Sequence, residues 1–353
     1  MESSTSSHLS VAMTTEEDNT TQTAGGIKTS SSSSIFNVSL QYALTLIGVV
    51  GTAGNALIMY ALVASKQHKK HALIVNQNAL DLFSSFFLVV KYAMMLCNVY
   101  PAGTFGHFLC VIIFSEFIIW WGMAGSAVNL AAITVDRYLK AVHPIWRKKW
   151  LRRRVIYMAM AFSWIMGFIA NSSHFFASAV IDGVCYGSVY YLSEAHKLVS
   201  YILYVLAFYV IIVVIFIFCY GRILVTIRRQ ARVMAGHDAT GSSTTQTQSH
   251  QNQSSVIKTM LLVSVLYAVT YLPSNVVFLM IILAPYSGYL IDVRFYSAVF
   301  IAFICPCANP FIYATKFDPV KKILSGMIVW KRNSVQSSDG SGTSGSRTGS
   351  RRT

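Results

Sequence analysis

The stretch Leu198–Gly221, LVSYILYVLAFYVIIVVIFIFCYG, contains no Asp, Glu, Lys or Arg. A helix needs about 20 consecutive apolar residues to cross the hydrocarbon core of a bilayer, and this stretch is long enough. The helices and strands of a soluble core alternate apolar and polar positions, whereas the apolar residues here are continuous. The stretch therefore predicts a membrane-spanning helix.

Six further apolar blocks flank this stretch. We expect the seven spans at 40–64, 72–96, 110–139, within the charge-free run 155–181, and at 198–221, 259–291 and 295–315. Composition agrees, because 12% of the 353 residues are charged and 54% are hydrophobic, whereas a soluble domain is about a quarter charged. The sequence thus predicts an all-α membrane protein, a bundle of seven transmembrane helices.

The basic residues predict how this bundle is oriented. Of the 28 Lys and Arg residues, 24 lie in four segments that fall on one side of the seven spans: 66–70, 137–154, 222–258 and 316–353. An excess of Lys and Arg marks the cytoplasmic loops of membrane proteins. A nucleic-acid module would instead gather its basic residues on one soluble face. We therefore attribute the net charge of +15 to topology and expect an extracellular amino terminus.

Polar segments lie around the spans. We expect a disordered extracellular tail at 1–39, the transmembrane domain at 40–316, a flexible cytoplasmic linker at 236–255, a short amphipathic helix on the membrane surface at 317–330, and a disordered cytoplasmic tail at 331–353. Asn19 and Asn37 begin Asn-x-Ser/Thr tripeptides in the segment placed outside, so they are candidate glycosylation sites.

Several polar residues lie inside the spans, where they are costly and often functional. Asn55 follows two small residues that let another helix approach, and a structural polar network is the simplest interpretation for Asn55 and Asn129. Ser126 and Asn309 are further polar candidates. A purely structural role is less expected for Asp81, because its charge needs a partner.

Two motifs carry a family resemblance: Asp136-Arg137-Tyr138 at the inner end of the third span and Asn309-Pro310-Phe311-Ile312-Tyr313 in the seventh. The pattern continues with Gly51-x-x-Gly54-Asn55, Asp81, Trp164, Tyr220, Pro273 and Phe105-Gly106 ahead of Cys110. Over residues 40–325 the chain resembles the rhodopsin-like (class A) G-protein-coupled receptors. The resemblance implies a receptor, not an enzyme, with an extracellular ligand and a heterotrimeric G protein as partners.

The resemblance also implies roles for single residues. Arg137 would stay against Asp136 at rest and turn toward the G protein on activation, where Tyr220 and Tyr313 would join it. An Arg that merely extends to the interface is the alternative. The switch residues implied are Asp136, Arg137, Tyr138, Tyr220, Asn309, Pro310 and Tyr313.

A disulfide between Cys110 and Cys185 is implied by the same resemblance. It would tie the outer end of the third span to the second extracellular loop and close a loop of about 75 residues. Pairing of Cys97 with Cys185 is the alternative.

The outer half of the third span departs from the family. The Asp of amine-binding receptors, seven residues after the first cysteine, is replaced by Phe117, while the count back from Arg137 gives Ile119. The two counts differ because the span holds two extra residues, which predicts a bulge or a shifted outer half. An amine ligand is disfavoured.

Other family positions also differ. Phe303 replaces the retinal-binding Lys, Tyr271 the usual Trp of the sixth span and Ile212 the usual proline of the fifth. Cys305 and Pro306 stand where Asn and Ser often surround a sodium ion. No cofactor is expected other than a weakly bound allosteric sodium, and no metal cluster; the core polar residues concerned are Asn55, Asp81, Ser126 and Asn309.

Two ionisable residues, Lys91 and Glu116, fall near the outer third of the bundle. We expect them to pair, because each alone would be an uncompensated buried charge. Alternatively, Lys91 receives an anionic and Glu116 a cationic ligand group. The ligand pocket that we expect is formed by Lys91, Glu116, Phe117, Tyr271 and Phe303.

A receptor for a non-amine ligand, first of all a peptide, is therefore the function predicted. The alternatives are a small-molecule chemosensory receptor of the same fold and a seven-helix transporter, which would need more polar residues along a path. The basic run Arg147–Arg154 is expected to meet membrane lipid and the G protein. Candidate phosphorylation sites for a receptor kinase and arrestin are Ser334, Ser337, Ser338, Ser341 and Thr343.

Overall fold

The computed structural model describes residues 27–99, 103–181, 184–186, 194–237, 244–283, 289–317, 320–321 and 323–326. Seven helical stretches of this part are long and apolar enough to cross a membrane. The elements are α1 (Ile27–Ala64), α2 (Ala72–Leu96), α3 (Gly103–Leu109), the π-helical turn η1 (Cys110–Phe114), α4 (Phe117–Val142), α5 (Pro144–Trp150), α6 (Arg153–Ala177), β1 (Ala179–Ile181), β2 (Val184–Tyr186), α7 (Glu194–Val205), the π-helical turn η2 (Leu206–Val210), α8 (Ile211–His237), α9 (Thr244–Leu283) and α10 (Tyr289–Lys316).

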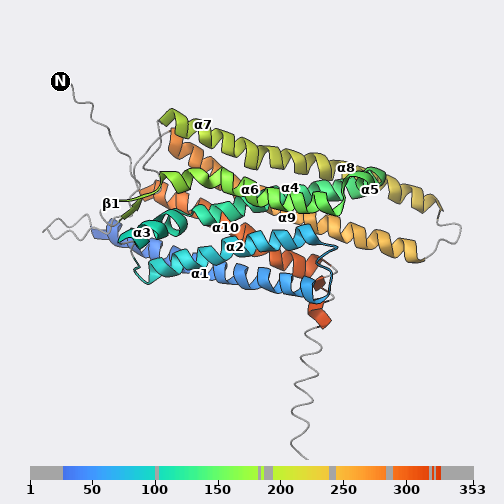
Figure 1. The fold of residues 1–353 in the computed structure, drawn as a ribbon, viewed down its shortest axis with the longest axis horizontal. Helices are drawn as coiled ribbons and strands as arrows, with labels where there is room; N and C mark the ends of the chain where they lie inside the picture. The colour runs from blue at the N-terminus through green and yellow to red at the C-terminus, as the bar shows by residue number, and fades with distance from the viewer. Residues whose placement is uncertain are drawn as a thin grey trace, which may run out of the picture.

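The spans lie side by side in one elongated bundle (Figure 1). The spans are α1, α2, the series α3–η1–α4, α6, the series α7–η2–α8, α9 and α10. Short α5, which carries Arg147, Lys148 and Lys149, lies at the end of the bundle opposite to α3 and β1. The predicted seven-helix architecture is confirmed.

Several element boundaries differ from those that the sequence predicts; the sixth span ends at Leu283, short of the predicted residue 291, and α10 already begins at Tyr289, ahead of the predicted residue 295. The fourth span ends at Ala177, because residues 179–181 form strand β1 of a two-stranded antiparallel hairpin. α1 already begins at Ile27, inside the predicted tail, after Gly25-Gly26 and with no Gly or Pro before Gly48 to interrupt it. α9 begins at Thr244, inside the predicted linker, whose glutamines are good helix formers.

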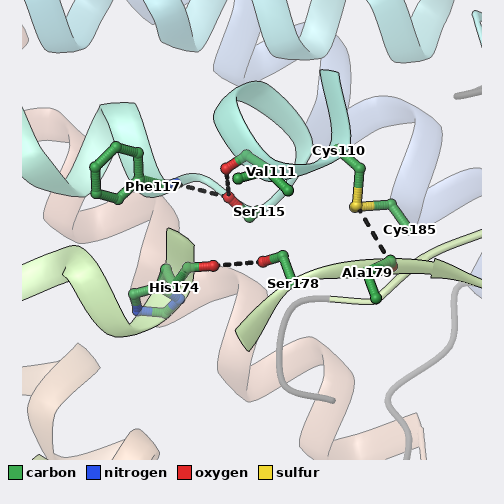
Figure 2. Close-up of a disulfide and its surroundings, with 8 residues drawn as sticks. All are labelled: Cys110, Val111, Ser115, Phe117, His174, Ser178, Ala179 and Cys185. Carbon is green, nitrogen blue, oxygen red and sulfur yellow. Dashed lines mark hydrogen bonds between the residues drawn. A yellow bond between two sulfur atoms is a disulfide. The ribbon is translucent and has the colours of Figure 1, made fainter. Parts of the chain in front are cut away.

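The third span contains the predicted bulge. Its helix widens into η1, and Glu116 then adopts a left-handed backbone conformation with φ 64° before α4 starts at Phe117. The Ser115 hydroxyl accepts a hydrogen bond from the Phe117 N–H (3.2 Å) and donates one to the Val111 carbonyl (2.6 Å), as Figure 2 shows. Because Ser readily binds the free amides of a helix start, the break occurs at a residue suited to it.

The fifth span is widened as well, although Ile212 replaces the usual proline. Its π-helical turn η2 covers Leu206–Val210, just before Ile212. The Tyr267 hydroxyl of α9 donates a hydrogen bond to the Phe208 carbonyl inside this turn. A side chain of a neighbouring helix thus binds a carbonyl at the irregular turn.

The described residues after α10 give only weak support to the predicted surface helix. Residues 320–321 and 323–326 are helical. Phe317 and Val320 are buried and belong to the hydrophobic core. The rest of 317–330 lies outside the described residues.

Candidate functional site

The predicted Cys110–Cys185 disulfide is present. It joins the start of η1 to β2, and Cys110 is fully buried. Figure 2 shows the hairpin lying beside the broken part of the third span, with the Ala179 carbonyl 3.5 Å from the Cys110 sulfur. Cys97 is exposed and free, so the alternative pairing is not formed. The disulfide therefore fixes the hairpin directly to the bulge.

The predicted pairing of Lys91 with Glu116 is confirmed. Lys91 Nζ lies 2.6 Å from Glu116 Oε1. The Trp120 indole donates a hydrogen bond to Oε2 (2.8 Å), and the Tyr92 hydroxyl donates a longer one to Oε1 (3.4 Å). Both oxygens of this carboxylate are thus occupied by groups of the protein itself, and the pair joins α2 to the bulge of the third span.

The three remaining predicted pocket residues pack on different neighbours. Phe303 of α10 is buried and packs on Trp120, which lies one helical turn after Glu116; the two ring centroids are 5.5 Å apart. Tyr271 is buried and packs on Tyr267. Phe117 instead packs against Phe168 and Phe175 of α6. In the described part of the chain, Phe117, Tyr271 and Phe303 therefore do not form one aromatic cluster. The left-handed residue before Phe117 alters the helical register at this point.

Asp81 is the centre of a buried polar cluster. Its carboxylate accepts hydrogen bonds from Ser126 Oγ (2.6 Å) and Asn309 Nδ2 (2.8 Å). Asn309 is the residue before Pro310 in α10. The two contacts together join the second, third and seventh spans at Asp81.

Asn55 replaces a backbone hydrogen bond that Pro310 removes from α10. Proline has no N–H, so the carbonyl four residues earlier, that of Pro306, loses its helical partner. Asn55 Nδ2 donates a hydrogen bond to this carbonyl (3.0 Å) and another to the Gly51 carbonyl (2.9 Å). The predicted structural role of Asn55 is in accord with this geometry, because one amide satisfies a carbonyl that would otherwise be unpaired.

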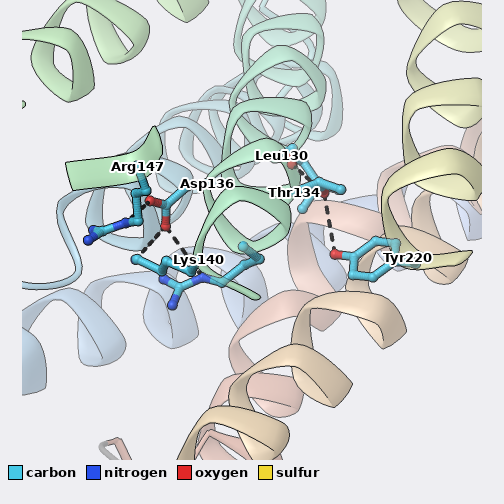
Figure 3. Close-up of polar contacts among 7 residues, drawn as sticks. Leu130, Thr134, Asp136, Lys140, Arg147 and Tyr220 are labelled. Carbon is cyan, nitrogen blue, oxygen red and sulfur yellow. Dashed lines mark hydrogen bonds and ion pairs between the residues drawn. The ribbon is translucent and has the colours of Figure 1, made fainter. Parts of the chain in front are cut away.

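Near the carboxyl-terminal end of α4, Asp136 is shared among three cations. Lys140 Nζ lies 2.5 Å and Arg147 Nε 3.4 Å from its carboxylate oxygens, whereas Arg137 Nε lies 3.6 Å away and makes no hydrogen bond. Figure 3 shows Asp136 facing Lys140 and Arg147, the latter contributed by α5. Arg137 is therefore only loosely held by its neighbour.

Two tyrosines of the predicted switch are buried near the same end. The Tyr220 hydroxyl accepts a hydrogen bond from Ser264 Oγ (3.2 Å) and lies 3.3 Å from Thr134 Oγ1 (Figure 3). The Tyr313 hydroxyl is buried without a hydrogen-bond partner. Tyr138, in contrast, points to His143 (3.1 Å) at the surface. Unpaired groups on Arg137 and Tyr313 leave this end able to form new hydrogen bonds.

The family 7 transmembrane receptor (rhodopsin family) matches residues 54–313. The chain belongs to this family. Its members are receptors, not enzymes, and this chain is a multi-pass membrane receptor.

Individual relatives are distant. The receptor is 26% identical to melatonin receptor type 1C of Xenopus laevis over 75% of its own chain and 61% of that protein. It is 25% identical to galanin receptor 2b of Danio rerio (79% and 71% covered) and 25% identical to the allatostatin-A receptor of Bombyx mori (76% and 73%). It thus spans less than two thirds of the length of the melatonin receptor.

The contacts of four residues of this receptor were not predicted from the sequence. Gln77 and Asn76 join the Asp81 cluster, and Lys140 and Arg147 bind Asp136. The run Asn76-Gln77-Asn78 was a usable signal, because three consecutive amides are unusual in an apolar span. Lys140 lies one turn after Asp136, a spacing at which opposite charges pair on a helix.

Several predicted modification sites remain predictions. Asn19 and the residues Ser334, Ser337, Ser338, Ser341 and Thr343 lie outside the described residues. Asn37 lies in α1, but its side chain is not among those described.

Proposed function

We propose that this receptor binds an extracellular non-amine ligand, first of all a peptide, and activates heterotrimeric G proteins at its cytoplasmic end. The observation that carries the ligand class is the state of Glu116. An amine needs a free carboxylate in the outer half of the bundle, and Glu116 already binds Lys91, Trp120 and Tyr92. At the two positions where the family's amine-binding Asp would fall, Phe117 and Ile119 are buried and apolar.

The relatives support this ligand class in part. Two of them are named as receptors for galanin and allatostatin-A, and a third as a receptor for melatonin. The melatonin relative favours a second candidate, a small-molecule receptor. Whether the ligand is a peptide or a small molecule, the hydrogen bonds and the ion pair of Glu116 disfavour recognition of a charged amine at this carboxylate.

The proposed orientation places the amino terminus outside the plasma membrane. It rests on the basic residues, which gather at the end of the bundle that carries α5, opposite the disulfide and the hairpin. Arg147, Lys148 and Lys149 of α5 would then face anionic lipid and the G protein. Glycosylation at Asn19 or Asn37, and binding of a receptor kinase and arrestin to the phosphorylated carboxyl-terminal tail, are part of the same proposal.

A ligand screen in cells tests the ligand class. Pools of peptides and pools of biogenic amines are applied to cells that express the receptor, with Arg137→Ala at equal surface level as the inactive control. We expect a peptide pool to produce a response that the control lacks, and the amine pools to produce none. A response to an amine that depends on Glu116 contradicts the proposal.

A further inference from the structure

Gln77 of α2 stands between Asp81 and the rest of the polar core. Its Nε2 donates to Ser126 Oγ and, at 3.3 and 3.4 Å, to the two Asp81 oxygens. Its Oε1 accepts a hydrogen bond from Asn129 Nδ2 (2.8 Å). The side chain is completely buried. Gln77 therefore both donates hydrogen bonds to the carboxylate and connects it to α4.

The orientation of the Gln77 amide is fixed by its neighbours. Asn129 Nδ2 also donates to the Leu73 carbonyl (2.9 Å), and Asn129 Oδ1 accepts from Asn76 Nδ2 (2.9 Å). If the Gln77 amide were reversed, its oxygen would face the Asp81 carboxylate and its NH₂ would face the NH₂ of Asn129. Both contacts would be repulsive, so only one orientation satisfies the network.

The groups that contact the Asp81 carboxylate are thus hydrogen-bond donors, and the buried oxygen left without a partner beside them is Asn309 Oδ1, a single amide oxygen. Ser126 accepts from Gln77 and donates to Asp81, and Asn309 directs its NH₂ at Asp81. A hard cation is held by several oxygen lone pairs and is poorly served by sulfur. Cys305 and Pro306, at two positions where side-chain oxygens often occur in the family, add no such oxygen. The residues present do not fit a sodium ion.

We propose that the Gln77 amide takes the place of a cation at Asp81, so that sodium does not regulate this receptor. Hydrogen bonds donated by three side chains, those of Gln77, Ser126 and Asn309, stabilise the carboxylate in place of a positive ion. The same amide extends the cluster from Asn309 through Asp81 and Asn129 to Asn76, which accepts from the Trp164 indole of α6 (3.0 Å). The core network then depends on a side chain, not on the ionic composition outside the cell.

The unmodified receptor provides the first test. Its thermal unfolding midpoint is measured in detergent in sodium chloride and in choline chloride at equal ionic strength. We expect the two midpoints to agree. A higher midpoint in sodium, removed by Asp81→Asn, overturns the proposal without any need for a ligand or a G protein.

The variant Gln77→Met tests the amide itself, because Met keeps the length of the side chain and loses its donors. We expect sodium to raise its midpoint by about 2–4 °C, the size expected for an ion present at about ten times its dissociation constant. The matched control is Asn78→Met in the same helix. Asn78 is equally buried but donates to the Ile74 carbonyl (2.8 Å), so this variant should remain insensitive to sodium. If Gln77→Met is also insensitive, the amide is not what excludes the ion and the proposal fails.

Discussion

Glu116 combines a left-handed backbone conformation, which is rare for a residue other than glycine, Asn or Asp, with a partly buried charge. Its φ is 64°, and Lys91 is its ion-pair partner. Such a conformation persists only where the surroundings stabilise it. Here the ion pair and the indole of Trp120 supply that stabilisation, so the residue links the bulge to α2.

This pairing predicts the behaviour of three variants. Lys91→Met and Glu116→Gln should each lower stability and signalling, because breaking the pair leaves an uncompensated charge or polar group. The cost is about 3–5 kcal/mol for a fully buried pair and less for this partly buried one. The charge-swapped double variant Lys91→Glu with Glu116→Lys should recover part of the loss. Surface expression and ligand response are the measurements. If both single variants behave like the unmodified receptor, the pair has no such role.

A second prediction concerns Asp136, which Lys140 and Arg147 hold more closely than Arg137 does. Lys140→Met removes the nearest competing cation, so Asp136 should bind Arg137 more strongly. We expect a lower basal rate of nucleotide exchange by the G protein. Lys69→Met, which changes an exposed cation between α1 and α2, is the control. A basal rate that rises in Lys140→Met contradicts the competition.

His71, just before α2, predicts a dependence of stability on pH. Burial, with the positive charges of Arg137, Lys70 and Lys140, lowers its pKa from 6.5 to about 4. The unfolded chain therefore binds a proton at His71 at higher pH than the folded chain does, and stability is lost as the pH falls from 6.5 toward 4. The unfolding midpoint of His71→Phe should fall less over this window. Equal slopes for the two proteins contradict the assignment.

At the scale of the helices, small residues decide how closely the spans approach. A Cβ atom added at Gly167 of α6 would lie 2.5 Å from the Trp121 carbonyl and 2.7 Å from the Gly125 nitrogen, both backbone atoms of α4. A Cβ atom at Gly221 of α8 would meet nothing within 4 Å. The two glycines are thus a matched pair for testing the packing.

Gly167→Ala should lower the unfolding midpoint by roughly 5 °C or more, because two helix backbones must separate to admit the methyl group. Gly221→Ala should leave it unchanged or raise it slightly, since Ala is the better helix former. Thermal unfolding in detergent compares them. Equal midpoints for the two variants would show that α4 and α6 are not packed this closely.

The third span also shows how far the sequence could predict the structure. Counting from Cys110 and from Arg137 revealed two extra residues, and the bulge follows from this difference. Its form did not follow, because a Glu with positive φ goes against local preference and depends on Lys91 of another span. Gln77 was missed for a related reason. Its partners Ser126 and Asn129 lie on another helix, and spacing along one helix does not identify them.

At the scale of the molecule, the two ends of the bundle differ in chemistry. The outer end, by the proposed orientation, holds a disulfide, a hairpin and an ion pair whose charges cancel. The inner end holds Arg137 and Tyr313 with buried unpaired groups, and three cations around one carboxylate. The polar core around Asp81 lies between them. A ligand at one end that alters the core would thus act on groups at the other end that lack fixed partners.

Nucleotide exchange in membranes tests this account most directly. Membranes that contain the receptor and heterotrimeric G proteins are exposed to peptide pools, and exchange is compared with that in Arg137→Ala membranes at equal receptor level. The account predicts exchange above background that Arg137→Ala abolishes. The absence of exchange under every ligand pool, with the receptor intact at the cell surface, would contradict it.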